Sequence, residues 1–418
     1  MSLRFSDELP RSSETLVVGA GVVGVWVALL SLRGIDCEFG ALDAAGDQVT
    51  LLDAWGCAHP RATSADETRI LHLAHGADPL LTNWAWRARE RWLAVERETS
   101  VSLFSRTGVI WWTRSQDGWE DRSVPLMLAE GLNVEVVPSS TLVETWPAFA
   151  SADVGRALLD LDGGVLRART ACRTVAGAFE RDGGCLGLAA VMPGRARGDR
   201  LIDVVDRRGD RYQASQFVFA CGPWLPKVFP EVVGNFIRVT KQDVVILGLA
   251  ERSAGSVYGQ LPPWIDRGQL FYGIPADPRG FKLGANRLGP EWDPSNGERV
   301  VDPDSIRLAR RYVRTMFPIL ADQPVVETRV CQYETTPDEN FVIDQHPYLR
   351  NVWLVGGGSG RGFKHAPSIA EYLVARMGGL TDHTTEMARR FSLTRDPDGP
   401  DSGKERLGDR ISVNWGPF

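Results

Sequence analysis

The sequence predicts an α/β fold, in which a Rossmann-like nucleotide-binding domain is assembled from discontinuous segments and a second, antiparallel-sheet (α+β) domain is inserted between them. Two observations support this. A strand, a glycine-rich turn and a helix follow one another near the N-terminus, and the same succession returns at 352–377. Between them, 236–249 and 268–285 are rich in strand-forming residues. Both ends of the chain are therefore expected to contribute to one sheet.

Length and composition exclude several classes of protein. The chain has 418 residues, of which 43% are hydrophobic and 24% are charged, which is enough for two or three globular domains. A net charge of −6 disfavours a general nucleic-acid binder. The longest apolar run, about 16–32, is interrupted by glycines, so it predicts a strand, a turn and a buried helix rather than a membrane span. We also expect no secretory signal.

The six cysteines are scattered along the chain without a CxxC pair. This spacing matches neither a zinc site nor a dense disulfide framework. Reduced thiols in the cytoplasm are the simplest expectation. The quaternary state stays open between a monomer and a homodimer.

The N-terminal turn has the sequence Gly19-Ala-Gly-Val-Val-Gly24, between the strand 15–18 and a helix that continues from Val25. In such a fingerprint the first glycine permits the tight turn, the second (Gly21) lets the backbone approach a pyrophosphate, and the third lets the helix pack on the strand. The free N–H groups at the helix N-terminus favour phosphate. A dinucleotide is therefore the predicted ligand, although nicotinamide and flavin enzymes share the motif.

The acidic residue that binds the ribose should close the next strand, about 20 residues further on. Two candidates compete for this position. Asp43 has the better spacing, 19 residues after Gly24. Asp53 closes the better strand, 49–53, if about 36–48 is an insertion before it. We prefer Asp53, and Asp43 remains the alternative.

The same reading predicts the domain boundaries. The nucleotide-binding domain is expected to comprise 11–98, 156–232 and 322–395. The second domain, which would bind the substrate, is expected to comprise 99–155 and 233–321. The remaining segment, 396–418, is rich in Gly, Asp and Arg and is expected to form a C-terminal tail.

Five segments carry motifs that occur together in one group of enzymes. They are the glycine fingerprint, Asp53 with Thr68-Arg69, Phe271-Tyr272-Gly273-Ile274-Pro275 with Phe281-Lys282-Leu283-Gly284, Cys331-Gln332-Tyr333 with Thr336-Pro337-Asp338, and Ser359-Gly360-Arg361-Gly362-Phe363-Lys364. On these motifs the chain resembles the flavin amine oxidases of the D-amino-acid oxidase superfamily, over about 14–395. The branch that contains monomeric sarcosine oxidase and N-methyltryptophan oxidase is the most similar. The last two segments are the most specific.

The resemblance implies FAD as the cofactor and, in that branch, a thioether that joins the cysteine of the fourth motif, here Cys331, to the flavin ring. The alternative for a cysteine is a small buried apolar residue, which fits the other five. Backbone N–H groups of Gly362 and Phe363 would face the flavin pyrimidine, where negative charge develops on reduction. The implied cofactor-binding residues are Gly19, Gly21, Gly24, Asp53, Cys331, Gly360, Gly362, Phe363 and Lys364.

The resemblance also implies three catalytic cations, Lys282, Arg69 and Lys364. Lys282 matches a lysine that activates O₂, since a preorganised cation in a dry site stabilises charge that develops on oxygen. Arg69 matches an arginine close over the flavin ring, and Lys364 a lysine that pairs with the substrate carboxylate. For each cation the alternative is an ordinary surface residue. The implied substrate-binding residues are His72, Tyr272, Tyr333, Arg361 and Lys364.

Three positions depart from the sarcosine oxidases. Ala65 and His72 stand where those enzymes have a His and an Arg, and Arg361 stands where they have a His. A histidine does not reproduce the bidentate grip of an arginine on a carboxylate. Ala65 is expected to leave room beside the substrate. We therefore expect a substrate other than sarcosine, and larger.

These residues predict an FAD-dependent oxidase that converts a secondary amine or amino acid to an imine while O₂ is reduced to H₂O₂. The alternative is a flavin-dependent desaturase or dehydrogenase of a cyclic amine in a biosynthetic pathway. A nicotinamide-dependent oxidoreductase and a flavin-binding protein without turnover are the other readings. The expected partners are a small-molecule amine and O₂, with neither nucleic acid nor membrane.

Overall fold

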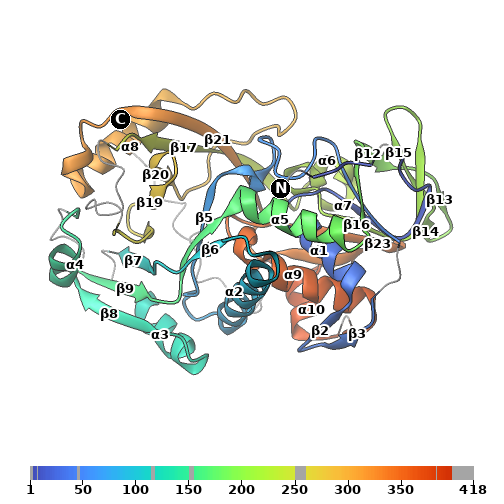
Figure 1. Ribbon diagram of the computed structural model, residues 1–418, viewed down its shortest axis with the longest axis horizontal. Coiled ribbons are helices and arrows are strands. Elements are labelled where there is room, and N and C mark those ends of the chain that lie inside the picture. Colours follow the sequence, from blue (N-terminus) through green and yellow to red (C-terminus); the bar gives the residue numbers. More distant parts are fainter. Residues whose placement is uncertain are drawn as a thin grey trace.

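The computed structural model describes residues 3–6, 8–44, 48–113, 118–149, 155–249, 260–382 and 384–397. Nearly all of the predicted tail, 396–418, lies outside the described residues. Within the described part, the strands form two eight-stranded sheets and three smaller ones. Figure 1 shows the two large sheets at opposite ends of the molecule, with helices α2 and α5 and the strands β5 and β6 between them.

The first large sheet has a parallel core, as a Rossmann-like domain requires. Its strand order is β11 (Cys185–Leu188), β4 (Val49–Asp53), β1 (Ser12–Val18), β16 (Arg211–Phe219) and β23 (Leu349–Gly356). Ser12 of β1 lies beside Gln213 of β16, so segments about 200 residues apart pair directly. Antiparallel strands extend this sheet, namely β22 (Val342–His346), β15 (Asp203–Asp206) and β12 (Val191–Pro193). The predicted α/β class is confirmed.

Helices cover both faces of the parallel core. On one face α1 (Val22–Arg33) packs between α5 (Ala168–Arg181) and α9 (Gly362–Met377), and α2 (Pro79–Thr99) packs on α9. Ten of the twelve α1 residues are buried, because helices and sheet surround it. This explains the apolar run in the sequence, and no helix among the described residues is both long and apolar enough to span a bilayer. On the other face lie α6 (Leu225–Val228) and α7 (Pro230–Val233).

The second large sheet is antiparallel apart from one parallel pair, β18 with β7. Helix α8 (Pro303–Met316) packs against it, and Tyr312 and Phe317 join Trp264 and Phe281 in a separate aromatic core. In sheet order, the strands are β21 (Val325–Thr335), β17 (Arg238–Leu247), β20 (Gly280–Ala285), β19 (Phe271–Asp277), β18 (Trp264–Asp266), β7 (Val109–Thr113), β9 (Arg156–Asp160) and β8 (Val134–Pro138).

The remaining elements are short. A three-stranded sheet of β5 (Thr68–Leu71), β10 (Gly164–Arg167) and β6 (Phe104–Ser105) lies between the large sheets. The others are the pairs β2 (Ile35–Cys37) with β3 (Gly40–Leu42) and β13 (Ala196–Arg197) with β14 (Arg200–Leu201), the α-helices α3 (Trp119–Ala129), α4 (Ser139–Thr145) and α10 (Glu386–Phe391), and the 3₁₀ turns η1 (Thr63–Ala65), η2 (Gly222–Trp224) and η3 (Pro318–Leu320).

Two strands differ from the predicted domain boundaries. Both β9 and β21 were expected in the nucleotide-binding domain, yet each pairs within the antiparallel sheet, β9 with β7 and β8, and β21 with β17. The chain crosses between the two domains after each of these strands, not before it. The predicted boundaries were placed before the strands and therefore assigned both strands to the wrong domain. With this change the two-domain division remains our proposal.

Candidate active site

The glycine fingerprint forms the turn between β1 and α1. Gly19 has a φ of +107°, and a Cβ there would overlap the carbonyl oxygen of Ala220 at the end of β16. A Cβ on Gly24 would overlap the carbonyl oxygen of Gly19, so the helix packs tightly on the turn. Helix α1 begins at Gly21, which has no side chain to cap it; the N–H of Val22 donates to the hydroxyl of Ser64 at 3.0 Å, and Gly21, Val22 and Val23 all line the adjoining cavity.

Asp53 occupies the position expected of the ribose-binding carboxylate. It closes β4 beside β1 and accepts backbone N–H bonds from Ala20 at 2.8 Å, Trp55 at 2.8 Å and Gly56 at 2.7 Å. Burial raises the pKa of its carboxyl. Asp43 instead follows the β2–β3 hairpin and lies away from the cavity lining. The geometry favours Asp53, and ribose binding by it stays a prediction.

A cavity of about 560 Å³ extends from this turn toward the antiparallel sheet. Its lining comes from both large sheets and from β5, so distant segments build it together. The predicted site residues that line it are Gly19, Gly21, Asp53, Arg69, His72, Tyr272, Lys282, Cys331, Tyr333, Gly360, Arg361, Gly362, Phe363 and Lys364. Gly24, which was also predicted to bind the cofactor, does not line the cavity, because it packs against Gly19 in the turn.

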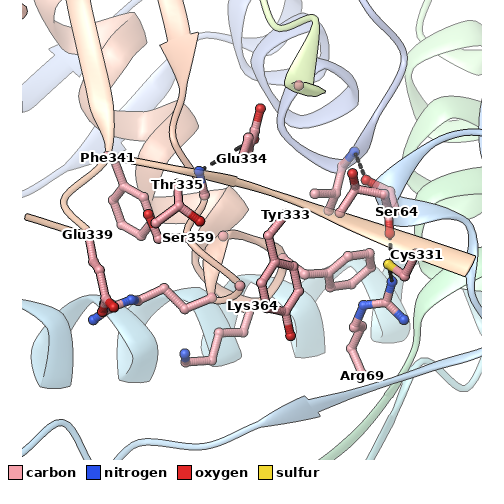
Figure 2. A pocket seen from close by; sticks show the side chains of 18 of the residues that line it. Ser64, Arg69, Cys331, Tyr333, Glu334, Thr335, Glu339, Phe341, Ser359 and Lys364 are labelled. Atoms are coloured by element: carbon pink, nitrogen blue, oxygen red, sulfur yellow. Dashed lines mark hydrogen bonds and ion pairs between the residues drawn. The ribbon is translucent and has the colours of Figure 1, made fainter. Parts of the chain in front are cut away.

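Strand β21 brings Cys331 and Tyr333 to the cavity. Alternate residues of a strand share a face, so these two side chains lie on the same side. The sulfur of Cys331 is half-buried and lies 3.8 Å from Nη2 of Arg69. The guanidinium of Arg69 lies over the ring of Phe363, 5.9 Å from its centre. Figure 2 shows Cys331 beside Arg69, with Lys364 at the opposite side of Tyr333.

Lys282 is enclosed on β20, with only 1% of its surface exposed. Its ammonium donates to the carboxylate of Asp66, to the carbonyl oxygen of Thr68 at 2.9 Å and to the Thr68 hydroxyl at 3.3 Å. That hydroxyl in turn donates to Asp277 at 2.5 Å. The predicted residue is therefore not a surface lysine. Burial lowers the pKa of Lys282, and the charge of Asp66 opposes this.

Lys364 lies near the start of α9 and is 2% exposed. Its Nζ is 3.0 Å from Nε2 of His72, whose Nδ1 is 3.1 Å from the carbonyl oxygen of Ala74. A carbonyl oxygen only accepts, so Nδ1 carries the proton and Nε2 accepts from Lys364. Burial and then the charge of Lys364 hold the pKa of His72 well below its usual value, so the imidazole is neutral.

Arg361 already has a carboxylate partner. Its guanidinium pairs with Glu339, a residue in the left-handed conformation at a φ of 57°. Lys364 has no carboxylate within ion-pair distance in the part of the chain that is described. Burial and then the charge of Arg361 hold the pKa of Lys364 well below its usual range. Of these two cations, Lys364 is the better placed to receive an anionic ligand.

Ala65 does not play the predicted part. It is 1% exposed in the turn η1 and does not line the cavity, although its neighbours Ser64 and Asp66 do. The expectation that Ala65 leaves room beside the substrate is therefore wrong. The end of the cavity away from the fingerprint is bounded instead by an aromatic wall, in which Trp111 and Trp119 have ring centres 4.6 Å apart.

Sequence reasoning missed three features of the site. Asp66, Glu334 and the wall of Trp111 and Trp119 all line the cavity. Burial raises the pKa of Glu334 to about 7, and its Oε2 is buried without a hydrogen-bond partner among the described residues. Figure 2 shows Glu334 and Tyr333 pointing to opposite sides of β21, so Glu334 faces the nucleotide-binding sheet. Of these three features, only the aromatic wall could have been suspected from the sequence, because tryptophans are frequent near 111–119.

Comparison with known proteins identifies the group to which these features belong. The family model described as DAO, FAD dependent oxidoreductase, matches residues 14–376. Monomeric sarcosine oxidase from Arthrobacter sp. (strain TE1826) is 24% identical over 395 residues, which cover 93% of this chain and 97% of that protein. N-methyl-L-tryptophan oxidase from Salmonella arizonae is 25% identical over 388 residues, which cover 91% and 97%.

Solved structures show the same fold. L-proline dehydrogenase from P. horikoshii superposes with a TM-score of 0.77 at 20% identity, covering 92% of this chain and 98% of that one. Fructosyl amine:oxygen oxidoreductase (Amadoriase I) from Aspergillus fumigatus gives 0.73 at 19% identity, covering 91% and 90%. The glycine turn, the start of α1 at the cavity and the carboxylate of Asp53 fit the dinucleotide that the family model implies. The chain belongs to the DAO family of FAD-dependent oxidoreductases.

Proposed function

We propose that the protein is an FAD-dependent oxidase of a secondary amine or amino acid larger than sarcosine, which forms an imine and reduces O₂ to H₂O₂. The observation that carries this proposal is the pair of buried lysines on one cavity, Lys282 and Lys364, which Cys331 of β21 also lines. The relatives support it, since their names describe oxidases of sarcosine, of N-methyl-L-tryptophan and of fructosyl amines.

Lys364 is proposed to bind the substrate carboxylate. It is a buried lysine whose hydrogen-bond neighbour, His72, is neutral and which has no carboxylate at ion-pair distance among the described residues, so burial holds its pKa well below the usual value. A ligand carboxylate would supply the missing counter-ion and so recover part of the cost of burying the lysine. The aromatic wall of Trp111 and Trp119 would then contact the apolar part of the substrate.

The cavity also favours a neutral substrate amine. FAD, when bound, accepts the two electrons and the proton that leave the substrate carbon and passes the electrons to O₂. Arg69, Lys282 and Lys364 all line the cavity, and a further cation among them is disfavoured. An amine that enters this site therefore loses its proton more easily. No side-chain base is needed when the amine arrives neutral.

Cys331 is proposed to attach the flavin covalently. Its half-buried sulfur faces the cavity from the same side of β21 as Tyr333. Cys221 also lines the cavity, but at the end of β16 near Asp53, and so provides a matched control. We expect the Cys331→Ala protein to release its yellow colour on acid precipitation, whereas the wild type and Cys221→Ala retain it in the pellet. Free flavin from the unmutated protein would disprove the attachment.

A peroxide-coupled screen of N-methyl amino acids, cyclic amino acids and secondary amines tests the function itself. We expect turnover of a substrate that carries one carboxylate and a bulky apolar group, with little activity on sarcosine. Bleaching of the flavin without peroxide under air would favour the second candidate, a dehydrogenase or desaturase of a cyclic amine. That candidate is supported by the likeness to L-proline dehydrogenase. In the oxidase, Lys282 is proposed to be the cation that activates O₂, since it is a buried charge that lines the cavity.

We propose a cytoplasmic location for the protein. All six cysteines lie among the described residues, and none of them forms a disulfide, which fits a reducing compartment. A monomer or a homodimer is expected, and sedimentation analysis distinguishes the two.

A further inference from the structure

We infer that Asp66 is a positioning residue, which holds Arg69 and Lys282 in place at the cavity and so maintains the positive charge on which reaction with O₂ depends. The inference deepens the proposed function and rests on it, because it takes Lys282 as the O₂-activating cation. No motif in the sequence assigns a role to Asp66.

The two carboxylate oxygens of Asp66 have different neighbours. Oδ2 accepts a hydrogen bond from Lys282 and lies 3.1 Å from Nη1 of Arg69, and both cations line the cavity. Oδ1 lies 2.7 Å from Nη2 of Arg279 and 3.5 Å from Nη1 of Arg329, neither of which lines the cavity. The carboxylate of Asp66, which is 4% exposed, therefore binds both cations that line the cavity (the inner cations, Lys282 and Arg69). On the side away from the cavity it binds two further arginines (the outer arginines, Arg279 and Arg329).

The outer arginines keep Asp66 from cancelling the charge of the inner cations. Arg279 bridges Asp66 to Asp277 at 2.8 Å and to Glu327 at 3.0 Å. Among the described residues of this cluster, four cations meet three carboxylates, namely Lys282, Arg69, Arg279 and Arg329 against Asp66, Asp277 and Glu327. The two cations that line the cavity, Lys282 and Arg69, share a single carboxylate, so positive charge remains at that surface.

Asp66 also fixes the orientation of the Lys282 ammonium. An ammonium has three N–H donors, and here all three meet acceptors, one on Asp66 and two on Thr68. Lys282 therefore acts as a stationary charge rather than as a mobile proton donor. Replacing the Asp66 carboxylate by an amide of the same shape removes the charged acceptor and leaves the two neutral ones.

The protonation of Lys282 depends on the same carboxylate. Burial lowers the pKa of Lys282, and Asp66 opposes that effect. Burial alone would raise the pKa of Asp66, but the charges of Lys282 and Arg69 hold it well below its usual range, so Asp66 stays ionised. Without it, Lys282 would lose its proton at a lower pH. The other charged or titratable groups around the pair are Arg69, Asp277, Arg279, Arg329, Glu327 and Tyr272.

The first test compares the holoenzyme variants Asp66→Asn, Lys282→Met and, as a control, Glu67→Gln. Glu67 adjoins Asp66 in the sequence, but its side chain pairs with Arg169 and does not line the cavity. We expect Asp66→Asn to slow reoxidation by O₂ about 10- to 100-fold, while flavin reduction by substrate changes less than about threefold. The basic limb of the pH profile of reoxidation should move to lower pH in this variant. Glu67→Gln should match the wild type in both half-reactions.

A second readout needs no turnover. The pH at which the bound, oxidised flavin loses its N3 proton can be followed by absorbance, and nearby positive charge lowers that pH. A positioning role predicts a higher midpoint in Asp66→Asn, because the cations move or lose charge. A lower midpoint would show that Asp66 merely screens them, and would overturn the inference.

The outcomes separate the two proposals. Normal reoxidation in Lys282→Met would refute the O₂-activating role and the inference with it. Slow reoxidation in Lys282→Met together with wild-type behaviour of Asp66→Asn would refute the inference alone. Where Asp66→Asn does not accumulate as holoenzyme, Asp66→Glu serves instead. It keeps the charge but displaces it, so a wild-type pH profile with slowed reoxidation is expected, and a wild-type rate would refute the positioning role.

Discussion

The two buried lysines of the cavity have nearly the same exposure, 1% for Lys282 and 2% for Lys364, but opposite surroundings. Lys282 is bound by a carboxylate and two neutral oxygens, so its charge is balanced within the chain. Lys364 has a neutral imidazole beside it and, among the described residues, no carboxylate at ion-pair distance, with Asp160 acting on it only from further away. The difference shows that burial alone does not define the role of a lysine. A buried lysine that is held by fixed partners acts as a stationary charge, whereas one without a carboxylate at ion-pair distance is open to an anionic ligand.

The largest effect should come from removing the lysine without a carboxylate. We expect Lys364→Met to lower kcat/KM for a carboxylate substrate about 100- to 1,000-fold, since loss of one partner from a buried charge pair costs about 2–5 kcal/mol. Steady-state kinetics on the best substrate of the screen measures this. The matched control is the same substrate as its uncharged amide, on which the variant should lose little. Equal losses on both substrates would show that Lys364 is structural.

A smaller effect is expected at the other lysine. Lys282→Met should slow flavin reoxidation by O₂ about 100-fold, because a preorganised charge beside the reacting centre is removed. Reduction by substrate under anaerobic conditions should stay within about threefold of the wild type. Stopped-flow absorbance resolves the two half-reactions. If the rates of reoxidation and of reduction fell by the same factor, Lys282 would have no specific role in the reaction with O₂, and the proposed difference between the two lysines would be contradicted.

The smallest effect is a pH dependence that the two lysines do not share. The folded-state pKa of Lys364 lies below its usual value, so its charge is present at low pH and is lost as the pH rises through that lowered pKa. Binding of phenylacetate should therefore weaken about tenfold per pH unit above it. Phenylacetamide is the neutral control and should bind independently of pH. By linkage the free protein gains stability over the same rise, because the unfolded chain still holds the proton.

Local patterns in the sequence predicted much of the fold. The strand, glycine turn and helix at 15–33 are specified by contiguous residues and appear as expected. The assignment of β9 and β21 to the nucleotide-binding domain was wrong, because the sequence of a strand does not show which sheet it will join. Asp53 was preferred to Asp43 because it closes the better strand, and the pairing of β4 with β1 agrees with that choice.

The site was harder to predict because its contacts join distant residues. Lys364 and His72 are 292 positions apart, and Asp66 and Lys282 are 216 apart. The motifs placed the lysines at the cavity but not their partners. Asp66 adjoins the Thr68-Arg69 motif, yet nothing local distinguishes it from Glu67, which instead binds Arg169.

The pairing of β16 with both β1 and β23 has a consequence for biosynthesis. At about 5–20 residues per second, β1 is made roughly 20 to 70 seconds before β23 can join the same sheet. Until then the parallel core lacks β23, and the cavity lacks residues 358–364, which line it. Cofactor capture must therefore wait until almost the whole chain has left the ribosome. Supply of a chaperone and of flavin at that late stage should limit the yield of holoenzyme.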